Sequence, residues 1–174
     1  STLQKLGGRA VGLSGIDGRM LQGTILDTDL GYVGKISSVD TTLIEQTINS
    51  GFIPVIAPMA THVMDASDEA GKLLNINGDT AAGEIAKELG ADSLVFMTDV
   101  EGIINSSNEV ISKIDSKEGY DLIQSGTVAG GMIPKLEACL NALENVNTAQ
   151  IIDGRKVGSL LALVDGNSFG TKIV

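Results

Sequence analysis

The sequence predicts an α/β fold with a mainly parallel sheet, and two observations point to this class. Short apolar runs alternate with stretches of helical periodicity, which is the pattern of parallel strands joined by crossover helices. Glycine supplies 22 of the 174 residues, about 13% against an average of about 7%, and three glycine-bearing loops precede predicted helices or follow predicted strands.

The first half of the chain predicts two strands and a helix between them. Residues 10–13 form a short buried strand that leads into a glycine-rich loop, and residues 53–57 form the next buried strand. Between them, Asp40 is a favourable N-cap for a helix that runs through Ile48, and Gly51 is a favourable stop.

The second half repeats this alternation. An amphipathic helix with apolar residues at i, i+3, i+4 and i+7 ends at Gly90, and a strand over residues 94–97 follows it. Gly130-Gly131 then opens a long helix. The buried stripe of that helix is Met132, Leu136, Leu140 and Leu143. The last strands are expected over residues 149–152 and 171–174.

Composition argues against several classes of function. The chain has 12 basic and 22 acidic side chains, and its net charge of −10 argues against nucleic-acid binding, as does an aromatic content of 3%. No run approaches the roughly 20 apolar residues of a membrane span. A single cysteine, Cys139, excludes an internal disulfide, and a single histidine, His62, excludes a Cys/His zinc cluster. We therefore expect a cytoplasmic protein with no nucleic-acid partner, no membrane and no metal ligands of its own.

The first residues resemble the end of a helix. Residues 1–6 lead into a glycine cap at Gly7-Gly8 and then into the first strand. A domain seldom begins inside a helix whose partner strand is absent, so we expect the chain to be the later part of a longer α/β protein. A short, genuine N-terminal helix is the alternative.

The first two glycine-bearing loops offer candidate ligand groups. Residues 12–18 lack the glycine spacing of a dinucleotide-binding loop, and a tight turn explains them equally well. In the loop over residues 75–82, Asn75 and Asn77 alternate along an extended segment and Asp79 stands at the helix start. An ordinary N-cap needs only one such residue, so three of them favour a binding function.

The third loop, over residues 126–135, points to a phosphate. Gly126 and Gly131 have the spacing of a P-loop, but Met132-Ile133 replaces the lysine and hydroxyl residue that a P-loop requires. Lys135 instead lies in the first turn of the following helix, where a cation opposes the helix dipole. A phosphate bound at that helix N-terminus would make the lysine favourable, and a solvated surface lysine is the alternative.

The remaining polar residues carry weaker signals. Asp99 follows a strand at the ligand-binding edge of a parallel sheet, where it could bind a ribose or cap a turn. Cys139 is expected in the core, and His62 is not expected to act as a general base. A solvated loop is expected for Asp65, Asp68 and Glu69.

A series of segments in order resembles the amino-acid kinase family, and within it the kinases that act on N-acetyl-L-glutamate. These segments cover residues 8–18, 31–36, 53–58, 75–82, 98–102, 130–135 and 151–155. The resemblance implies a three-layer αβα fold with an open, mainly parallel sheet. It also implies that residues 1–97 form the later part of the acyl-substrate lobe and that residues 98–174 form the nucleotide-binding lobe.

The resemblance further implies a reaction and its residues. The γ-phosphoryl group of ATP, with Mg²⁺ as its partner, would pass to the side-chain carboxylate of N-acetyl-L-glutamate, a step of arginine biosynthesis. Lys135 would stabilise the transferring group, Asp79 would hold the catalytic lysines, and Asn75 would bind the acyl substrate with Asn77 close by. The implied nucleotide contacts are Asp99, Val100, Glu101, Gly102, Ile103, Ile104, Thr127, Val128 and Ala129. A homo-oligomer is expected.

One part of the family pattern is missing from the sequence. The family's opening strands, its first glycine-rich phosphate loop with a catalytic lysine, and its substrate-binding arginine have no counterpart here. Lys5-Leu6-Gly7-Gly8 imitates that phosphate loop but lies where the family has a later glycine pair. We therefore do not expect the chain to turn over substrate alone. The alternatives are a kinase acting on carrier-protein-linked aminoadipate and a non-catalytic nucleotide-binding fragment.

Overall fold

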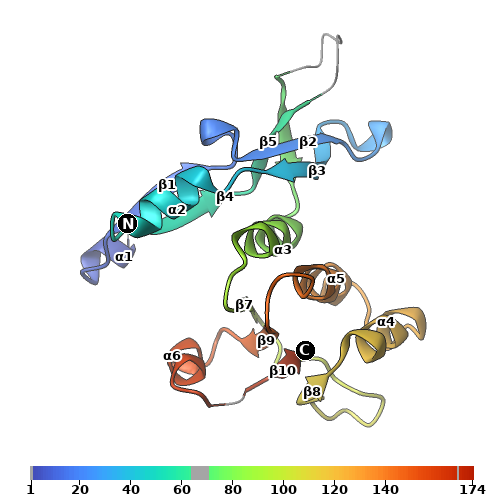
Figure 1. Cartoon of the computed structure of the whole chain (residues 1–174). Coiled ribbons are helices and arrows are strands. Elements are labelled where there is room, and N and C mark those ends of the chain that lie inside the picture. The colour runs from blue at the N-terminus through green and yellow to red at the C-terminus, as the bar shows by residue number, and fades with distance from the viewer. Residues whose placement is uncertain (1, 64–70, 168) are drawn as a thin grey trace. The chain divides into compact units, whose positions relative to one another are not determined.

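The computed structural model describes residues 2–63, 71–167 and 169–174 (Figure 1). The chain divides into two compact units, unit 1 over Ser1–Ala81 and unit 2 over Ala82–Val174. This division falls inside helix α3 (Gly78–Leu89), whereas the sequence predicts a boundary between residues 97 and 98. The predicted acidic loop of Asp65, Asp68 and Glu69 lies outside the described residues.

Unit 1 begins with the predicted helix end, α1 (Thr2–Lys5), and then forms a two-stranded parallel sheet. Strand β1 (Ala10–Ser14) pairs in register with β4 (Ile53–Ala57). Helix α2 (Thr42–Asn49) connects them and packs against β4. The predicted helix is present, but its N-cap is Thr41 and not Asp40. The Asp40 carboxylate, one residue earlier, still accepts a hydrogen bond of 2.9 Å from the Thr42 amide.

Two expectations for unit 1 are wrong, because neither β1 nor β4 is a buried strand. The residues of β1 are half-buried apart from Gly12, which is exposed. In β4, the side chains of Ile53 and Val55 are 49% and 48% exposed, while those of Pro54 and Ile56 are half-buried. Helix α2 packs on the strand, and alternate strand side chains point to opposite faces. Only one set of side chains is therefore covered.

The other four strands of unit 1 close into a ring. They are β2 (Leu21–Ile25), β3 (Val33–Val39), β6 (Leu73–Ile76) and β5 (Met59–His62). Pairing alternates around the ring between antiparallel (β2–β3, β6–β5) and parallel (β3–β6, β5–β2). The fully buried Leu74 packs against Gly34, where an added Cβ would lie 2.8 Å from the Leu74 Cδ1 atom. His62 is 2% exposed in the same ring. Two short 3-10 turns, η1 (Asp17–Arg19) and η2 (Thr28–Leu30), lie in the connections.

Unit 2 contains a four-stranded sheet. Its order is β7 (Leu94–Thr98), β9 (Ala149–Asp153), β10 (Thr171–Ile173) and β8 (Lys113–Ile114). The β7–β9 and β10–β8 pairs are parallel, and the β9–β10 pair is antiparallel. Three of these strands confirm the predicted segments, and the sheet is rich in parallel pairs, as expected for the α/β class.

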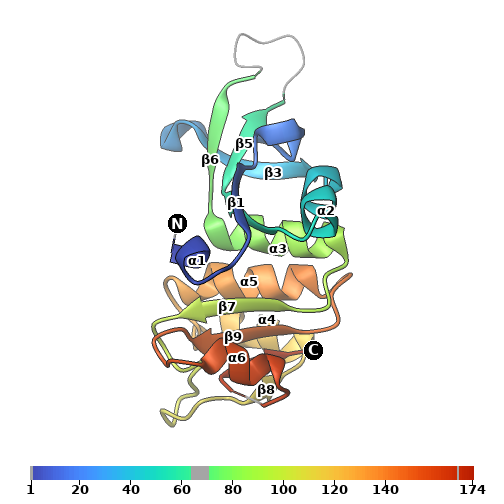
Figure 2. The ribbon, with the colours of Figure 1, turned by 90° about the vertical axis from the view of Figure 1, so that its left-hand side faces the viewer.

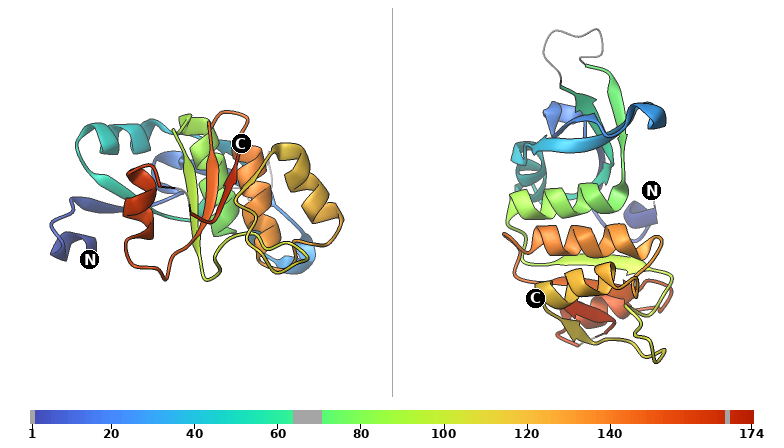
Figure 3. Two further views of the ribbon diagram at one scale, coloured as in Figure 1. Left: turned by 90° about the horizontal axis from the view of Figure 1, so that it is seen from below. Right: turned by 90° about the vertical axis from the view of Figure 1, so that its right-hand side faces the viewer.

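Helices cover both faces of this sheet, as Figures 2 and 3 show. Helices α4 (Ser116–Gln124) and α5 (Met132–Ala142) lie on one face, and α6 (Ser159–Val164) lies on the other. Unit 2 is therefore a three-layer α/β arrangement, as predicted. Helix α3 approaches α5 closely, because a Cβ added at Gly83 would lie 3.0 Å from the Ala138 Cβ atom.

The core of unit 2 is built around α5. Leu136 and Leu140 of its predicted stripe are buried against Ile151 and Ile173 of the sheet. Cys139 is fully buried in the same cluster, which confirms its place in the core. Within the described ranges, no helix has the length and apolar character needed to span a bilayer.

Candidate functional site

In the first glycine-bearing segment, residues 12–14 belong to β1 and residues 15–18 fold as a tight turn. The Ser14 amide donates a hydrogen bond of 2.8 Å to the Asp17 carboxylate, and the Gly15 amide donates one of 3.0 Å to the Ala57 carbonyl. These local contacts account for the segment as a turn that joins β1 to β2.

The second loop places its two asparagines differently. Asn75 lies in β6, its backbone amide bonds to the Tyr32 carbonyl at 2.8 Å, and its side chain is exposed. The side-chain oxygen of Asn77 instead accepts hydrogen bonds from the amides of Asp79 at 2.9 Å and Thr80 at 3.1 Å. Asn77 is therefore the cap of α3, and Asn75 is the amide left available to a ligand.

Asp79 lies in the first turn of α3 and is half-buried. A carboxylate in this position is stabilised by the positive end of the helix dipole. The cap by Asn77 fixes the backbone that carries Asp79, because the Asp79 amide is one of its two donors. The junction of β6 and α3 thus brings together the three polar residues that the sequence singled out.

The third loop leads into α5 as predicted. The helix begins after Gly131 without a side-chain cap, and an added Cβ at Gly130 or Gly131 would meet no atom within 4 Å. Lys135 lies in the first turn and is half-buried. The space in front of this helix end is therefore open, and a cation stands beside it, which is the arrangement that an anion at a helix N-terminus requires.

The segment before α5 has mixed exposure. Thr127 and Ala129 are exposed, whereas the side chain of Val128 is 3% exposed and belongs to the core. The Val128 amide bonds to the Leu122 carbonyl at 3.1 Å. Of the three predicted nucleotide contacts in this segment, Val128 therefore has its side chain packed in the core.

The loop after β7, residues 99–104, is held to β10 by a hydrogen bond at Ile103. The Ile103 amide donates a hydrogen bond of 2.8 Å to the Thr171 hydroxyl, and both side chains are buried. Gly102 has φ +158° and lies against the same hydroxyl, with an added Cβ only 2.8 Å away from it. Asp99, Glu101 and Ile104 remain exposed, and Val100 is half-buried.

The structure adds a residue pair to which the sequence assigned no role. Asp153 ends β9 opposite Thr98 of β7 and is 6% exposed. The Nε and Nη2 atoms of Arg155 donate to its two carboxylate oxygens, each at 2.9 Å, and the Arg155 amide donates at the same distance. These hydrogen bonds lower the pKa of Asp153 to about 2. Only the match to the family segment 151–155 could have drawn attention to them.

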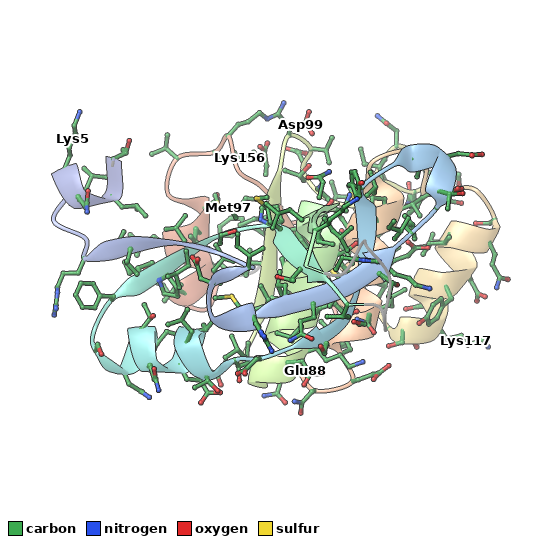
Figure 4. The ribbon with its side chains drawn as sticks, turned by 90° about the horizontal axis from the view of Figure 1, so that it is seen from above. Lys5, Glu88, Met97, Asp99, Lys117 and Lys156 are labelled. Carbon is green, nitrogen blue, oxygen red and sulfur yellow. The ribbon has the colours of Figure 1, made fainter. Side chains whose placement is uncertain are left out.

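The same strand ends carry a second ion pair and a cavity. Lys156 pairs with Glu101 of the loop after β7. Figure 4 shows Lys156 and Asp99 at one end of unit 2, beyond Met97 of β7. A cavity of about 470 Å³ adjoins this end, with Glu101, Asp153 and Lys156 among its lining residues. The carboxyl ends of adjacent parallel strands thus carry charged groups beside a concavity, as in α/β ligand sites.

Comparison with known proteins defines the class. The sequence pattern described as "Amino acid kinase family" matches residues 1–153. The chain belongs to the amino acid kinase family. The acetylglutamate kinase of Thermoanaerobacter sp. (strain X514) is 47% identical over 168 residues, covering 92% of this chain and 54% of that protein. The acetylglutamate kinase of Dehalococcoides mccartyi (strain CBDB1) is 39% identical over 173 residues, covering 99% of this chain and 64% of that protein.

A solved structure confirms the fold. The crystal structure of smu.665 from Streptococcus mutans UA159 superposes with a TM-score of 0.82 at 28% identity, covering 99% of this chain and 64% of that one. The chain spans 54% to 64% of the length of these three proteins.

Proposed function

We propose that this chain contributes the nucleotide-binding part and a portion of the acyl-binding part of a kinase acting on N-acetyl-L-glutamate. The reaction transfers the γ-phosphoryl group of ATP to the side-chain carboxylate. The observation that carries the proposal is that two proteins named acetylglutamate kinase match 92% and 99% of the chain at 47% and 39% identity.

Lys135 is the proposed stabiliser of the transferring group. Phosphoryl transfer is catalysed mainly by placing positive charge where negative charge develops on the phosphoryl oxygens. A half-buried ammonium group in the first turn of α5, beside an open helix end, suits that task. A lysine chosen for helix stability alone would be expected at the other end of the helix.

The junction of β6 and α3 is proposed to bind the acyl substrate. The exposed amide of Asn75 would hydrogen-bond to N-acetyl-L-glutamate. Asn77 would act from close by, through its cap on α3, which holds Asp79 in place. Asp79 would orient the catalytic lysines by charge attraction.

The nucleotide is proposed to contact residues 99–104 and 127–129. The exposed carboxylate of Asp99 is suited to the ribose hydroxyls, which are hydrogen-bond donors. The side chains of Ile103 and Val128 are buried, so these two residues would contribute backbone groups rather than side chains.

Mg²⁺ is proposed to arrive with ATP rather than to occupy a protein cage. In the part of the chain that the structure describes, no three acidic, histidine or cysteine side chains are grouped to hold a metal ion. Mg²⁺ commonly keeps several waters and binds through substrate phosphates. Its contribution when bound is to neutralise phosphate charge.

We place the reaction in arginine biosynthesis in the cytoplasm, carried out by a homo-oligomer. A coupled assay with ATP and N-acetyl-L-glutamate tests the activity, run on the chain alone and together with the polypeptide that precedes this stretch in the relatives. We expect turnover only in the mixture. If the mixture turns over carrier-linked aminoadipate but not acetylglutamate, the proposed substrate is wrong and aminoadipate takes its place. If the chain binds ATP but the mixture turns over neither substrate, the chain is a non-catalytic nucleotide-binding fragment.

A further inference from the structure

Arg155 is held in one orientation by a buried carboxylate. Asp153 is 6% exposed, and three donors of Arg155 occupy its two oxygens at 2.9 Å. The Asp153 carbonyl accepts a further bond from the Ser159 hydroxyl at 3.1 Å, and the Gly154 amide bonds to the Thr98 carbonyl at 2.8 Å. A two-pronged arginine–carboxylate pair of this kind fixes the guanidinium plane.

The fixed guanidinium stands among acids of the adjacent loop. The pKa of Arg155 is raised first by the hydrogen bond to Asp153 and then by the charges of Asp153, Asp99 and Glu101. Asp99 and Glu101 are exposed and belong to the loop that the proposed function assigns to the nucleotide. Arg155 itself remains 64% exposed, so it compensates these charges while still facing solvent.

An uncompensated acidic edge would repel a polyphosphate. Asp99, Glu101 and Asp153 gather at the ends of β7 and β9, in a chain whose net charge is −10. ATP bound at this edge brings several further negative charges. Within about 8–10 Å such repulsion is only partly screened at physiological salt. Lys156 pairs with Glu101, and Arg155 is the cation that is hydrogen-bonded to Asp153 and also interacts with the charge of Asp99.

We propose that Arg155, oriented by Asp153, is a positioning residue that compensates the acidic loop after β7 and so permits a nucleoside polyphosphate to bind there. The inference rests on the proposed function, because it assumes that this loop contacts the nucleotide. It predicts a specific signature: loss of Arg155 weakens binding of the charged nucleotide much more than binding of the uncharged nucleoside.

Titration calorimetry on the full chain tests this with two probes, ATP with Mg²⁺ and adenosine. For Arg155→Gln we expect the Kd for ATP to rise about three- to tenfold, as for loss of a partly exposed charge interaction, and the Kd for adenosine to stay within about twofold. Arg155→Lys restores the charge without the two-pronged geometry and should recover part of the ATP affinity. The ATP difference should shrink at about 0.5 M salt.

Lys117→Gln is the matched control, because it removes the same charge from the exposed surface of α4 in the same unit. It should leave both Kd values unchanged. Equal weakening of ATP and adenosine in Arg155→Gln, or no weakening, would overturn the inference while the proposed function stands. Failure of the unaltered chain to bind ATP would overturn the proposed nucleotide site and the inference with it.

Discussion

The backbone amide of Ile103 donates a hydrogen bond of 2.8 Å to the hydroxyl of Thr171, across 68 positions of sequence. Both residues are buried, and the contact ties the loop after β7 to the start of β10. A buried amide that loses its acceptor keeps the cost of desolvation, so removal of this hydroxyl should weaken the attachment of the loop to β10.

Thr171→Val should therefore destabilise the chain by about 1–3 kcal/mol, the cost of an unsatisfied buried donor. Denaturant unfolding measures the change. Thr171→Ser keeps the hydroxyl and should lose less stability and less ATP affinity than the valine variant. A valine variant as stable as the unaltered chain, with a destabilised serine variant, would mean that packing of the methyl group, and not the hydrogen bond, is what matters.

Lys135→Ala should abolish phosphoryl transfer in the reconstituted enzyme while leaving the Kd for ATP nearly unchanged. The reason is that, in the role proposed for Lys135, the ammonium group would interact with charge that develops in the transition state. Single-turnover rates and calorimetry separate the two effects. Lys117→Ala, on the exposed face of α4, is the control and should keep full activity. A Lys135→Ala variant with near-normal kcat would refute the assignment.

Asn75→Ala should raise the KM for N-acetyl-L-glutamate in the reconstituted enzyme and leave the KM for ATP unchanged. Loss of one substrate hydrogen bond costs about 1–3 kcal/mol, or roughly five- to 150-fold in KM. Steady-state kinetics with each substrate varied gives both values. If the KM for ATP rises instead, Asn75 belongs to the nucleotide site.

Asn77→Ala is predicted to act first on stability. Its side chain caps α3 through the amides of Asp79 and Thr80, and loss of such a cap costs about 0.5–2 kcal/mol. Asn77→Asp keeps a capping oxygen and should retain the stability. If the alanine variant is as stable as the unaltered chain, the cap by Asn77 does not contribute to stability.

Acid should weaken unit 2 through Asp153. Its pKa falls from 3.8 to about 2 in the folded chain, chiefly through the hydrogen bonds from Arg155. A depressed carboxyl pKa contributes stability above the unfolded value, and this contribution is lost as the pH falls from about 4 to about 2. Asp153→Asn should unfold with a shallower pH dependence across that window, measured by thermal melting.

Gly34→Ala should disrupt the ring of unit 1. An added Cβ would lie 2.8 to 3.0 Å from side-chain atoms of Leu74 and Ile76, and overpacking of this kind typically costs about 1–3 kcal/mol. Gly12→Ala is the matched strand control, since its Cβ would meet nothing within 4 Å. Similar stabilities for the two variants would show that the ring expands without cost.

The sequence predicted the elements that have strong local signals. Helix α5 was found from its apolar stripe and opening glycines, and α2 from Asp40 and its glycine stop. The ring strands were not found, because Gly23 and Gly34 interrupt their alternation and their burial depends on Leu74 from a distant strand. The exposure of β4 also escaped prediction, since periodicity cannot show whether one or both faces of a strand are covered.

The candidate site was predictable to a similar degree. Asn75, Asp79 and Lys135 stand out as polar or charged residues at element junctions, where a local rule can be applied. The sequence alone could not show that Asn77, and not Asn75, caps α3, because this difference is visible only in the hydrogen bonds of the folded chain. The pairing of Arg155 with Asp153 gave no comparable signal, because the role proposed for Arg155 depends on Asp99 and Glu101 of the loop after β7, which lie near it only in the folded chain.

The position of β10 bears on the order in which the protein can be made. This strand consists of residues 171–173 but lies in the interior of its sheet, between β9 and β8, which are synthesised earlier. On the ribosome, those two strands must therefore wait with facing edges unpaired until residue 173 has emerged. The loop at residues 99–104 receives its Thr171 anchor at the same late moment. The loop that we propose to contact the nucleotide is therefore anchored to β10 only after nearly all of these residues have been translated, so any stabilisation by a bound nucleotide at this loop would come late in folding.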